Sequence, residues 1–308
     1  MMETLNLKKK YMKCIISIFA LPYEIDDLEK TLTQLKIASN YISNKIEWVV
    51  DVTLGMSDEL IDWKKSSIPK QYFIDKFLKL STHTDWCMKT FRLSDEILGC
   101  VSQRRFTSLE YTDADFHIWL DTDIIFDERT LAYFESILPL VSQQTNYSIV
   151  TPEIVKIWDE TWDCLVNENY INHPLNYHKT NDPYKDSGIK GDIALEPISN
   201  SFPNQPRFKF AGGWFTCLSG DLLRRVGIPE SFSHYGYEDT FVMWGAEKLM
   251  KTTDINIQQY KIKNLIVCEN YRYRNNSHYI NNLSILDRRE EFKKIAEENF
   301  NEELQNLT

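Results

Sequence analysis

The sequence predicts an α/β fold with a mostly parallel central sheet flanked by helices, and two features carry this prediction. Residues 14–21 and residues 46–52 are apolar, β-branched runs, and a segment with apolar residues at helical spacing separates them. This β-α-β order implies a parallel sheet, whose strands bind ligands at their carboxyl ends. A later apolar run, residues 116–120, leads directly into Asp121. We therefore expect a binding site around Asp121.

Other elements follow from the same patterns. A second helix is expected over residues 94–109, and a further strand over residues 147–152, where Ile149 and Val150 are β-branched. A helix is expected after the first strand, because the apolar residues Leu28, Leu32, Leu35 and Ile37 recur near helical spacing.

The second half of the chain contains a long polar stretch, residues 167–206, which is rich in Asn, Pro, Tyr and Asp. This composition predicts a long loop, and loops of such length usually serve binding. Residues 286–304 are strongly charged but keep helical apolar spacing, which predicts a terminal helix packed on the surface.

The composition limits the possible functions. Hydrophobic residues make up 43% and aromatic residues 13% of the 308 positions, enough for a large core in one unit built from two lobes. The chain has 35 Lys and Arg against 45 Asp and Glu, a net charge of −10, which argues against nucleic acid as a partner. A nucleotide diphosphate remains compatible, because a divalent cation and a few basic groups can hold it on an acidic protein.

The six cysteines are scattered without a C-x-x-C pair or zinc-finger spacing, so we expect reduced, mostly buried thiols. Near its start, the chain has Lys8–Lys10 followed by an apolar run, which resembles a signal peptide. However, Pro22 and acidic residues follow this run, and no cleavage site is evident. A buried first strand fits better. No other apolar run approaches the length of a membrane helix, so we expect a protein without a transmembrane segment, in the cytoplasm.

The pair Asp121 and Asp123 follows the strand over residues 116–120. Two carboxylates on one side of a tight turn can bind Mg²⁺ or Mn²⁺ together with phosphate oxygens. A solvated turn is the alternative for the three letters alone, and the apolar Ile124 and Ile125 that follow favour a turn fixed at a sheet edge.

Four segments together resemble the GT-A glycosyltransferases, including the family-2-like and β-1,4-galactosyltransferase-like enzymes. These segments are the metal motif at residues 118–123, a glycine-bearing segment at 210–215, the helix end at 222–230 and a Gly-x-Glu-Asp motif at 235–241. The likeness spans roughly residues 13–280. It implies a GT-A (Rossmann-like) catalytic domain over residues 13–283, followed by a C-terminal helix over 284–308. The nucleotide-sugar-binding half would be residues 13–130, and the acceptor-binding half residues 131–283.

The resemblance also implies an activity. A sugar would move from a nucleotide-diphosphate donor, with a UDP-sugar favoured, to a hydroxyl of a glycan or glycoconjugate in polysaccharide biosynthesis, with Mn²⁺ or Mg²⁺ and inversion at the anomeric carbon. The Glu-Asp pair of the family maps onto Glu238 and Asp239, with Asp239 as catalytic base and Glu238 orienting the acceptor. A helix N-terminus, where acidic residues are favoured anyway, is the alternative for this pair.

Many relatives use a late His as a third metal ligand, which would make His278 a ligand beside Asp121 and Asp123. An exposed loop His is the alternative, and His234 is a rival position that could contact the acceptor instead.

The resemblance places nucleotide recognition at Asp51, taken as the acidic residue at the end of the second strand, although the surrounding residues depart from the family's pattern. Gly212 and Gly213 would let the backbone approach the sugars. Arg104 and Arg105 lie upstream of the metal motif and could reach the diphosphate, since Arg offers a bidentate fork. A solvated basic turn is the alternative for these two arginines.

Aromatic residues near the acceptor-like motifs, Trp214, Tyr235 and Tyr237, could stack on sugar rings, whereas Trp244 is expected in the core because it lies inside a helix. The sequence leaves two other functions open. A haloacid-dehalogenase-type phosphatase also has Asp-x-Asp after a strand, but there the motif normally opens the fold. A non-catalytic carbohydrate-binding relative is the second alternative.

Overall fold

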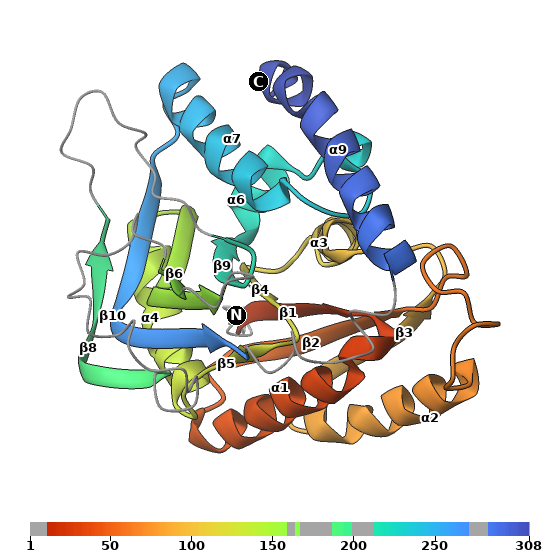
Figure 1. Cartoon of the computed structure of the whole chain (residues 1–308). Coiled ribbons are helices and arrows are strands. Elements are labelled where there is room, and N and C mark those ends of the chain that lie inside the picture. The colour runs from red at the N-terminus through yellow and green to blue at the C-terminus, as the bar shows by residue number, and fades with distance from the viewer. Residues whose placement is uncertain (1–10, 159–163, 167–186, 199–211, 271–282, 308) are drawn as a thin grey trace, which may run out of the picture.

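A single mixed sheet forms the centre of the computed structural model, which describes residues 11–158, 164–166, 187–198, 212–270 and 283–307 (Figure 1). Its strand order is β3-β2-β1-β4-β9-β6-β10-β5, with β7 beside β6 and β8 beside β10. The strands are β1 Met12–Ala20, β2 Ile46–Gly55, β3 Met88–Ser94, β4 Phe116–Leu120, β5 Ile124–Ile125, β6 Tyr147–Trp158, β7 Cys164–Val166, β8 Gly188–Pro197, β9 Phe215–Ser219 and β10 Ile257–Glu269.

The first four strands of this order, β3, β2, β1 and β4, are mutually parallel. Strand β9 then runs antiparallel to both β4 and β6, so β6 and its parallel neighbour β10 regain the direction of the first four. The predicted α/β fold with a mostly parallel sheet is confirmed. The arrangement agrees with the GT-A-like fold class that the sequence resembles.

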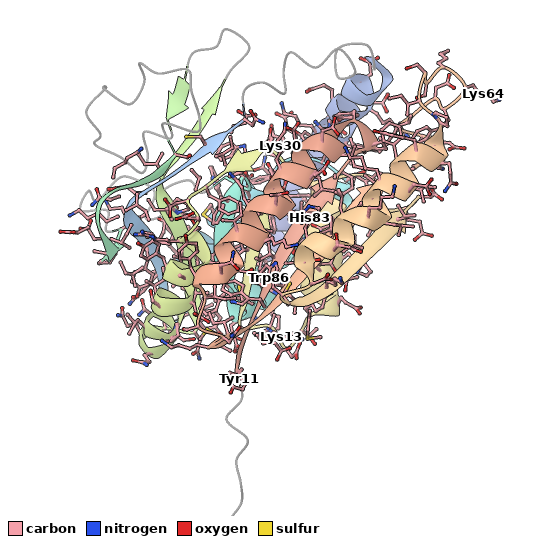
Figure 2. All side chains as sticks on the ribbon, turned by 90° about the horizontal axis from the view of Figure 1, so that it is seen from below. Tyr11, Lys13, Lys30, Lys64, His83 and Trp86 are labelled. Atoms are coloured by element: carbon pink, nitrogen blue, oxygen red, sulfur yellow. The ribbon has the colours of Figure 1, made fainter. Side chains whose placement is uncertain are left out.

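Helices cover both faces of the sheet. They are α1 Ile25–Ala38, α2 Lys70–Leu80, α3 Cys100–Glu110, α4 Thr130–Gln144, α6 Gly220–Val226, α7 Glu238–Thr252 and α9 Leu283–Asn306. One face packs on α1, α2 and α4. The view from below in Figure 2 shows α1 and α2 side by side over this face. The other face packs on α3, α6 and α7, and α9 lies against α7 (Figure 1).

Strand β4 shows how alternation builds both cores. Phe116, Ile118 and Leu120 point into the core beneath α1 and α4, whereas Trp119 joins the core around α6 and α7. Side chains of a strand alternate between the two faces of its sheet, so an uninterrupted apolar run is what a strand covered on both faces requires.

Most expected elements are present, with two differences. The stretch predicted as loop over residues 167–206 contains β8, which pairs antiparallel with β10. This pairing partner lies more than sixty residues away, so local composition could not reveal it. The helix expected from residue 94 begins at Cys100, because Ser94 still belongs to β3 and Gly99 is the extended residue before the helix.

Other expectations concern single side chains. The expected helix is α1, on which Leu28, Leu32 and Leu35 are buried, whereas Ile37 is 43% exposed. Five cysteines of the described residues are free thiols, three of them buried. In the same part of the chain, no helix combines the length and the apolar character needed to cross a bilayer.

His117 in the centre of β4 is 1% exposed, and its Nδ1 atom has no hydrogen-bond partner. Burial lowers the pKa of this imidazole to about 3, and the positive charges of Arg224 and Lys13 act in the same direction. The ring is therefore neutral in the folded protein above about pH 3.

This burial makes folding pH-dependent. Between pH 6.5, the ordinary pKa of a histidine, and about 3, the unfolded chain binds a proton at His117 that the folded protein does not. The free energy of unfolding should then fall with falling pH by about 1.4 kcal/mol per unit from this residue. We expect urea unfolding of His117→Gln between pH 4 and 6.5 to show a shallower slope than the wild type. Equal slopes would contradict a neutral buried His117.

Candidate functional site

The turn Asp121-Thr122-Asp123 joins β4 to β5 at the carboxyl edge of the parallel strands, and three distant segments hold its backbone. The amide of Asp121 donates to the carbonyl of Trp214 at 3.0 Å, and the amide of Asn270 donates to the carbonyl of Asp123 at 2.6 Å. The Thr31 hydroxyl of α1 donates to the carbonyl of Thr122 at 2.5 Å. Hydrogen bonds with α1, with the segment before β9 and with the end of β10 thus fix the backbone of the turn that carries the two carboxylates.

Negative charge accumulates at this turn. Desolvation by the surrounding protein raises the pKa of Asp123 well above its usual range, and the charges of Glu269, Asp121, Glu24 and Asp27 raise it further. Such repulsion favours either a proton or a bound cation. The atoms that these carboxylates offer to a cation are all oxygens, which suits Mg²⁺ or Mn²⁺.

The residues present therefore fit a divalent cation held by Asp121 and Asp123. Within the residues that the structure describes, no three His, Cys, Asp or Glu side chains are arranged as a metal site on their own. The predicted third ligand, His278, lies outside the described residues. Its role stays a prediction.

Arg104 of α3 connects this turn to the second acidic motif. Its Nη2 atom donates to Asp121 Oδ1 at 2.8 Å and to the Gly213 carbonyl at 2.9 Å, while Nη1 is paired with Glu238 Oε1. The guanidinium also lies over the ring of Trp119, 5.0 Å from its centroid. The Arg104 side chain is only 4% exposed, so all its contacts are within the protein.

Glycine is required where the chain passes Arg104. A Cβ atom on Gly213 would lie 2.1 Å from Arg104 Nη1, and one on Gly212 would lie 2.0 Å from the Trp214 ring. The predicted role of these glycines was close approach of backbone to sugars. In the structure the close approach is to side chains of the protein itself, and contact with sugars stays a prediction.

Glu238 and Asp239 begin α7, directly after Tyr237, whose φ of 67° turns the chain into the helix. Glu238 is 3% exposed and contacts Arg104 and the thiol of Cys100, whose Sγ lies at 3.7 Å. Asp239 Oδ2 accepts from the Gly213 amide at 3.1 Å, and its Oδ1 accepts from the Thr240 amide at 2.6 Å. Burial, with the charge of Glu238, raises the pKa of Asp239 to about 6. Asp239 thus combines a fixed direction with a pKa suited to accepting a proton near neutrality.

The structure brings together Asp121, Asp123, Arg104, Glu238 and Asp239, but not the other two residues proposed for the donor. Asp51 lies inside β2, four positions before the strand ends at Gly55, so its placement at the strand's end is wrong. It is fully buried, and its carboxylate accepts from Arg92 at 2.9 Å and from Tyr111 at 2.8 Å.

Arg105 serves the backbone. Its guanidinium donates to the carbonyls of Ile228, Pro229 and Ser233 at 3.2, 2.7 and 3.0 Å, which fixes the turn that precedes α7. The sequence predicted that Arg105 would contact either the diphosphate or solvent. The contacts of its guanidinium in the structure are with the protein backbone.

The structure also has a pocket at the carboxyl edge, which the sequence analysis did not predict. It lies between the β1–α1 turn, the segment after β2 and the start of α2. Its lining includes the aromatic residues Tyr23, Trp63, Tyr72 and Phe73 and also Asp26, whose carboxylate accepts from Lys76. No motif marks these positions, since they come from three separate segments.

Aromatic positions near α7 differ from expectation at one point. Trp244 is 56% exposed, so its expected place in the core is wrong. Its ring meets the edge of Phe300 in α9, a helix that the local sequence around Trp244 could not position.

Comparison with known proteins gives likeness in structure only. Neither a family model nor a curated protein sequence matches the chain. Among solved structures, mannosyltransferase PcManGT from Pyrobaculum calidifontis, in complex with GDP-Man and Mn²⁺, is similar at 13% identity and a TM-score of 0.45, over 90% of this chain and 64% of that one. GalNAc-T7 with UDP, GalNAc and Mn²⁺ is similar at 7% identity and a TM-score of 0.43, over 85% of this chain and 44% of that one.

A nucleotidyltransferase also appears. The inositol-1-phosphate CTP transferase from T. maritima is similar at 12% identity and a TM-score of 0.38, over 90% of this chain and 97% of that one. This chain spans less than two thirds of the length of either glycosyltransferase. At these scores the likenesses carry no argument about activity. The fold class follows from the strand order and the chemistry from the side chains.

Loss of the Arg104 cation should destabilise the fold strongly. We expect Arg104→Met to lower the free energy of unfolding by about 3–5 kcal/mol, because it leaves the carboxylate of Glu238 buried without its partner. The double variant Arg104→Met with Glu238→Gln should lose less than the sum of the two single variants. Urea unfolding measures both.

The matched control is Arg225→Met, since Arg225 is an exposed arginine of α6. It should change stability by no more than about 0.5 kcal/mol. Additive losses in the double variant would show that Arg104 and Glu238 act independently, contrary to the contact described above.

Proposed function

We propose that this chain is a metal-dependent glycosyltransferase that moves a sugar from a nucleotide-diphosphate donor to a hydroxyl of a glycan or glycoconjugate. One observation carries the proposal: Arg104 contacts both the Asp121–Asp123 turn and the Glu238-Asp239 pair, which are more than a hundred residues apart. This contact supports a single site in which a donor-side cation and a carboxylate base act together.

On the donor side, Asp121 and Asp123 would hold Mn²⁺ or Mg²⁺. The bound cation would supply charge neutralisation to the departing diphosphate, as a Lewis acid. Hydrogen bonds from Thr31 and Asn270 keep the backbone of the turn in place. The aromatic pocket beside the β1–α1 turn supports a place for the nucleoside, because flat rings suit a nucleobase.

On the acceptor side, Asp239 would take the proton of the attacking hydroxyl. The bond from the acceptor oxygen to the anomeric carbon forms as the bond from that carbon to the diphosphate breaks, and the proton passes to a carboxylate oxygen of Asp239. A single displacement of this kind inverts the anomeric carbon. Glu238 was expected to orient the acceptor, but its contacts support a positioning role through Arg104.

The proposal keeps residues 13–130 as the donor half and residues 131–283 as the acceptor half of one domain, followed by the C-terminal helix. A UDP-sugar remains the favoured donor. Nucleic acid is not a proposed partner, since the chain carries a net charge of −10.

Metal-dependent turnover tests the proposal. We expect release of UDP or GDP from one member of a panel of UDP- and GDP-sugars in the presence of Mn²⁺, and loss of this release on chelation. Asp123→Ala should lower turnover by at least about a hundredfold, because the cation loses a ligand. Asp58→Ala is the matched control, since the side chain of Asp58 is 84% exposed and far along the chain from either motif.

Absence of turnover together with absence of Mn²⁺-dependent nucleotide binding would overturn the proposal. It would favour the carbohydrate-binding alternative, which binding of free oligosaccharides would then reveal. Retained nucleotide binding without transfer would point to a missing acceptor, which a panel of glycans can supply.

The base has its own pH signature. With a pKa of about 6 for Asp239, kcat/KM should be level above pH 6 and fall about tenfold per unit below it, because protonation removes the base. Asp239→Asn should lower kcat by about a hundredfold to ten-thousandfold and abolish this limb of the profile. An unchanged acid limb in Asp239→Asn would assign the base to another residue.

A further inference from the structure

A diphosphate at the Asp121–Asp123 turn brings negative charge to a place that is already acidic. Four carboxylates add to the charge that Asp123 experiences. A single divalent cation does not balance such a set, so a protein cation that faces the turn should assist it.

The two arginines expected to assist are engaged elsewhere. Arg104 is 4% exposed and bound to Asp121, Gly213 and Glu238. Arg105 is tied to three backbone carbonyls of the turn over residues 228–233. Each would have to break several hydrogen bonds to reach a ligand.

Arg289 of α9 is placed differently. Its Nη2 atom lies 3.3 Å from Glu24 Oε1 in the β1–α1 turn, and its guanidinium lies over the ring of Tyr235, 4.9 Å from the centroid. Its side chain is 20% exposed. The start of α1 beside Glu24 is in turn joined to the metal turn, since Asn270 donates its side-chain amide to Asp27 Oδ1 at 3.3 Å and its backbone amide to the Asp123 carbonyl at 2.6 Å. Arg289 therefore stands between the β1–α1 turn, the loop before α7 and the metal turn.

We propose that Arg289 of the C-terminal helix binds the diphosphate of the nucleotide donor. This inference rests on the proposed function. The guanidinium would donate to phosphate oxygens while the cation at Asp121 and Asp123 binds others, and Glu24 and Tyr235 hold it in position until the ligand arrives. A planar fork with several donors matches the geometry of phosphate. The C-terminal helix thereby becomes part of the donor site.

An alternative role for Arg289 is to anchor α9. Other contacts already do so, however. Phe292 is 5% exposed in a cluster with Leu60 and Ile97, and Phe300 packs against Phe232 and Phe241. Further attachment comes from the hydrogen bond of Ser231 to Glu303 and from Lys248, which donates to backbone carbonyls near the end of α9. With these contacts in place, α9 should stay attached to the domain when the Arg289 guanidinium is removed.

The neighbouring Arg288 is a matched control. It lies on the same turn of α9, is 39% exposed, and pairs with Glu59 and Glu291 on the surface. Titration calorimetry with UDP and GDP in the presence of Mn²⁺ should give Arg289→Gln a dissociation constant at least about tenfold higher than that of the wild type, the size of one charge-assisted hydrogen bond. Arg288→Gln should stay within about twofold. Arg289→Lys should fall between the wild type and Arg289→Gln, because the charge remains but the fork is lost.

Glu24→Gln separates the two roles of Arg289. This variant breaks the same ion pair but retains the guanidinium of Arg289, which is still able to bind a phosphate. If Arg289 binds the diphosphate, Glu24→Gln retains or strengthens nucleotide binding; if Arg289 only anchors α9, both variants weaken binding alike, and the inference is overturned. Thermal unfolding of each variant checks that the helix remains folded on the domain.

The outcomes also separate this inference from the proposed function. Wild-type protein that binds neither UDP nor GDP with Mn²⁺ would overturn both. If the wild type binds a nucleotide and Arg289→Gln binds it equally tightly, the role of Arg289 alone is overturned. The glycosyltransferase proposal then remains.

Discussion

A single buried guanidinium organises this protein. Transfer of a charged group from water into a protein interior costs several kcal/mol unless its partners are close and well oriented. Arg104 finds such partners at three places: the carboxyl end of β4, the segment before β9 and the start of α7. Its burial is favourable only when these three segments lie next to one another. Each of these segments carries one part of the site, so the condition for burying Arg104 is also the condition for assembling the site.

The glycines follow from the same constraint. Gly213 offers its carbonyl to Arg104 and its amide to Asp239, and a Cβ atom there would overlap the guanidinium. One residue without a side chain thus links the cation to the carboxylate proposed as base. Its amide donates to Asp239 and its carbonyl accepts from Arg104, which gives the buried acid and the buried cation complementary partners.

The acidic turn shows the opposite situation. Desolvation raises the pKa of Asp123, and the surrounding carboxylates raise it further, so this arrangement is unfavourable unless positive charge is added. Structures rarely keep such a cluster for stability. The turn is held by three hydrogen bonds from other segments, so the protein holds these carboxylates together rather than letting them separate. Preorganisation of this kind is what cation binding demands.

The sequence by itself determined the class of fold and the chemistry of the motifs. Continuous apolar runs such as residues 116–120 required strands buried on both faces, and carboxylates directly after such a run required a polar site at the sheet edge. Tertiary structure alone decided which residues meet there. The sequence predicted Arg105 and Asp51 at the site together with Arg104 and Asp121. In the fold, Arg105 instead donates to backbone carbonyls, and Asp51 accepts from Arg92 and Tyr111. Strand β8, the exposure of Trp244 and the position of Arg289 depend on partners far along the chain, and periodicity within a window of a few residues contains no information about them.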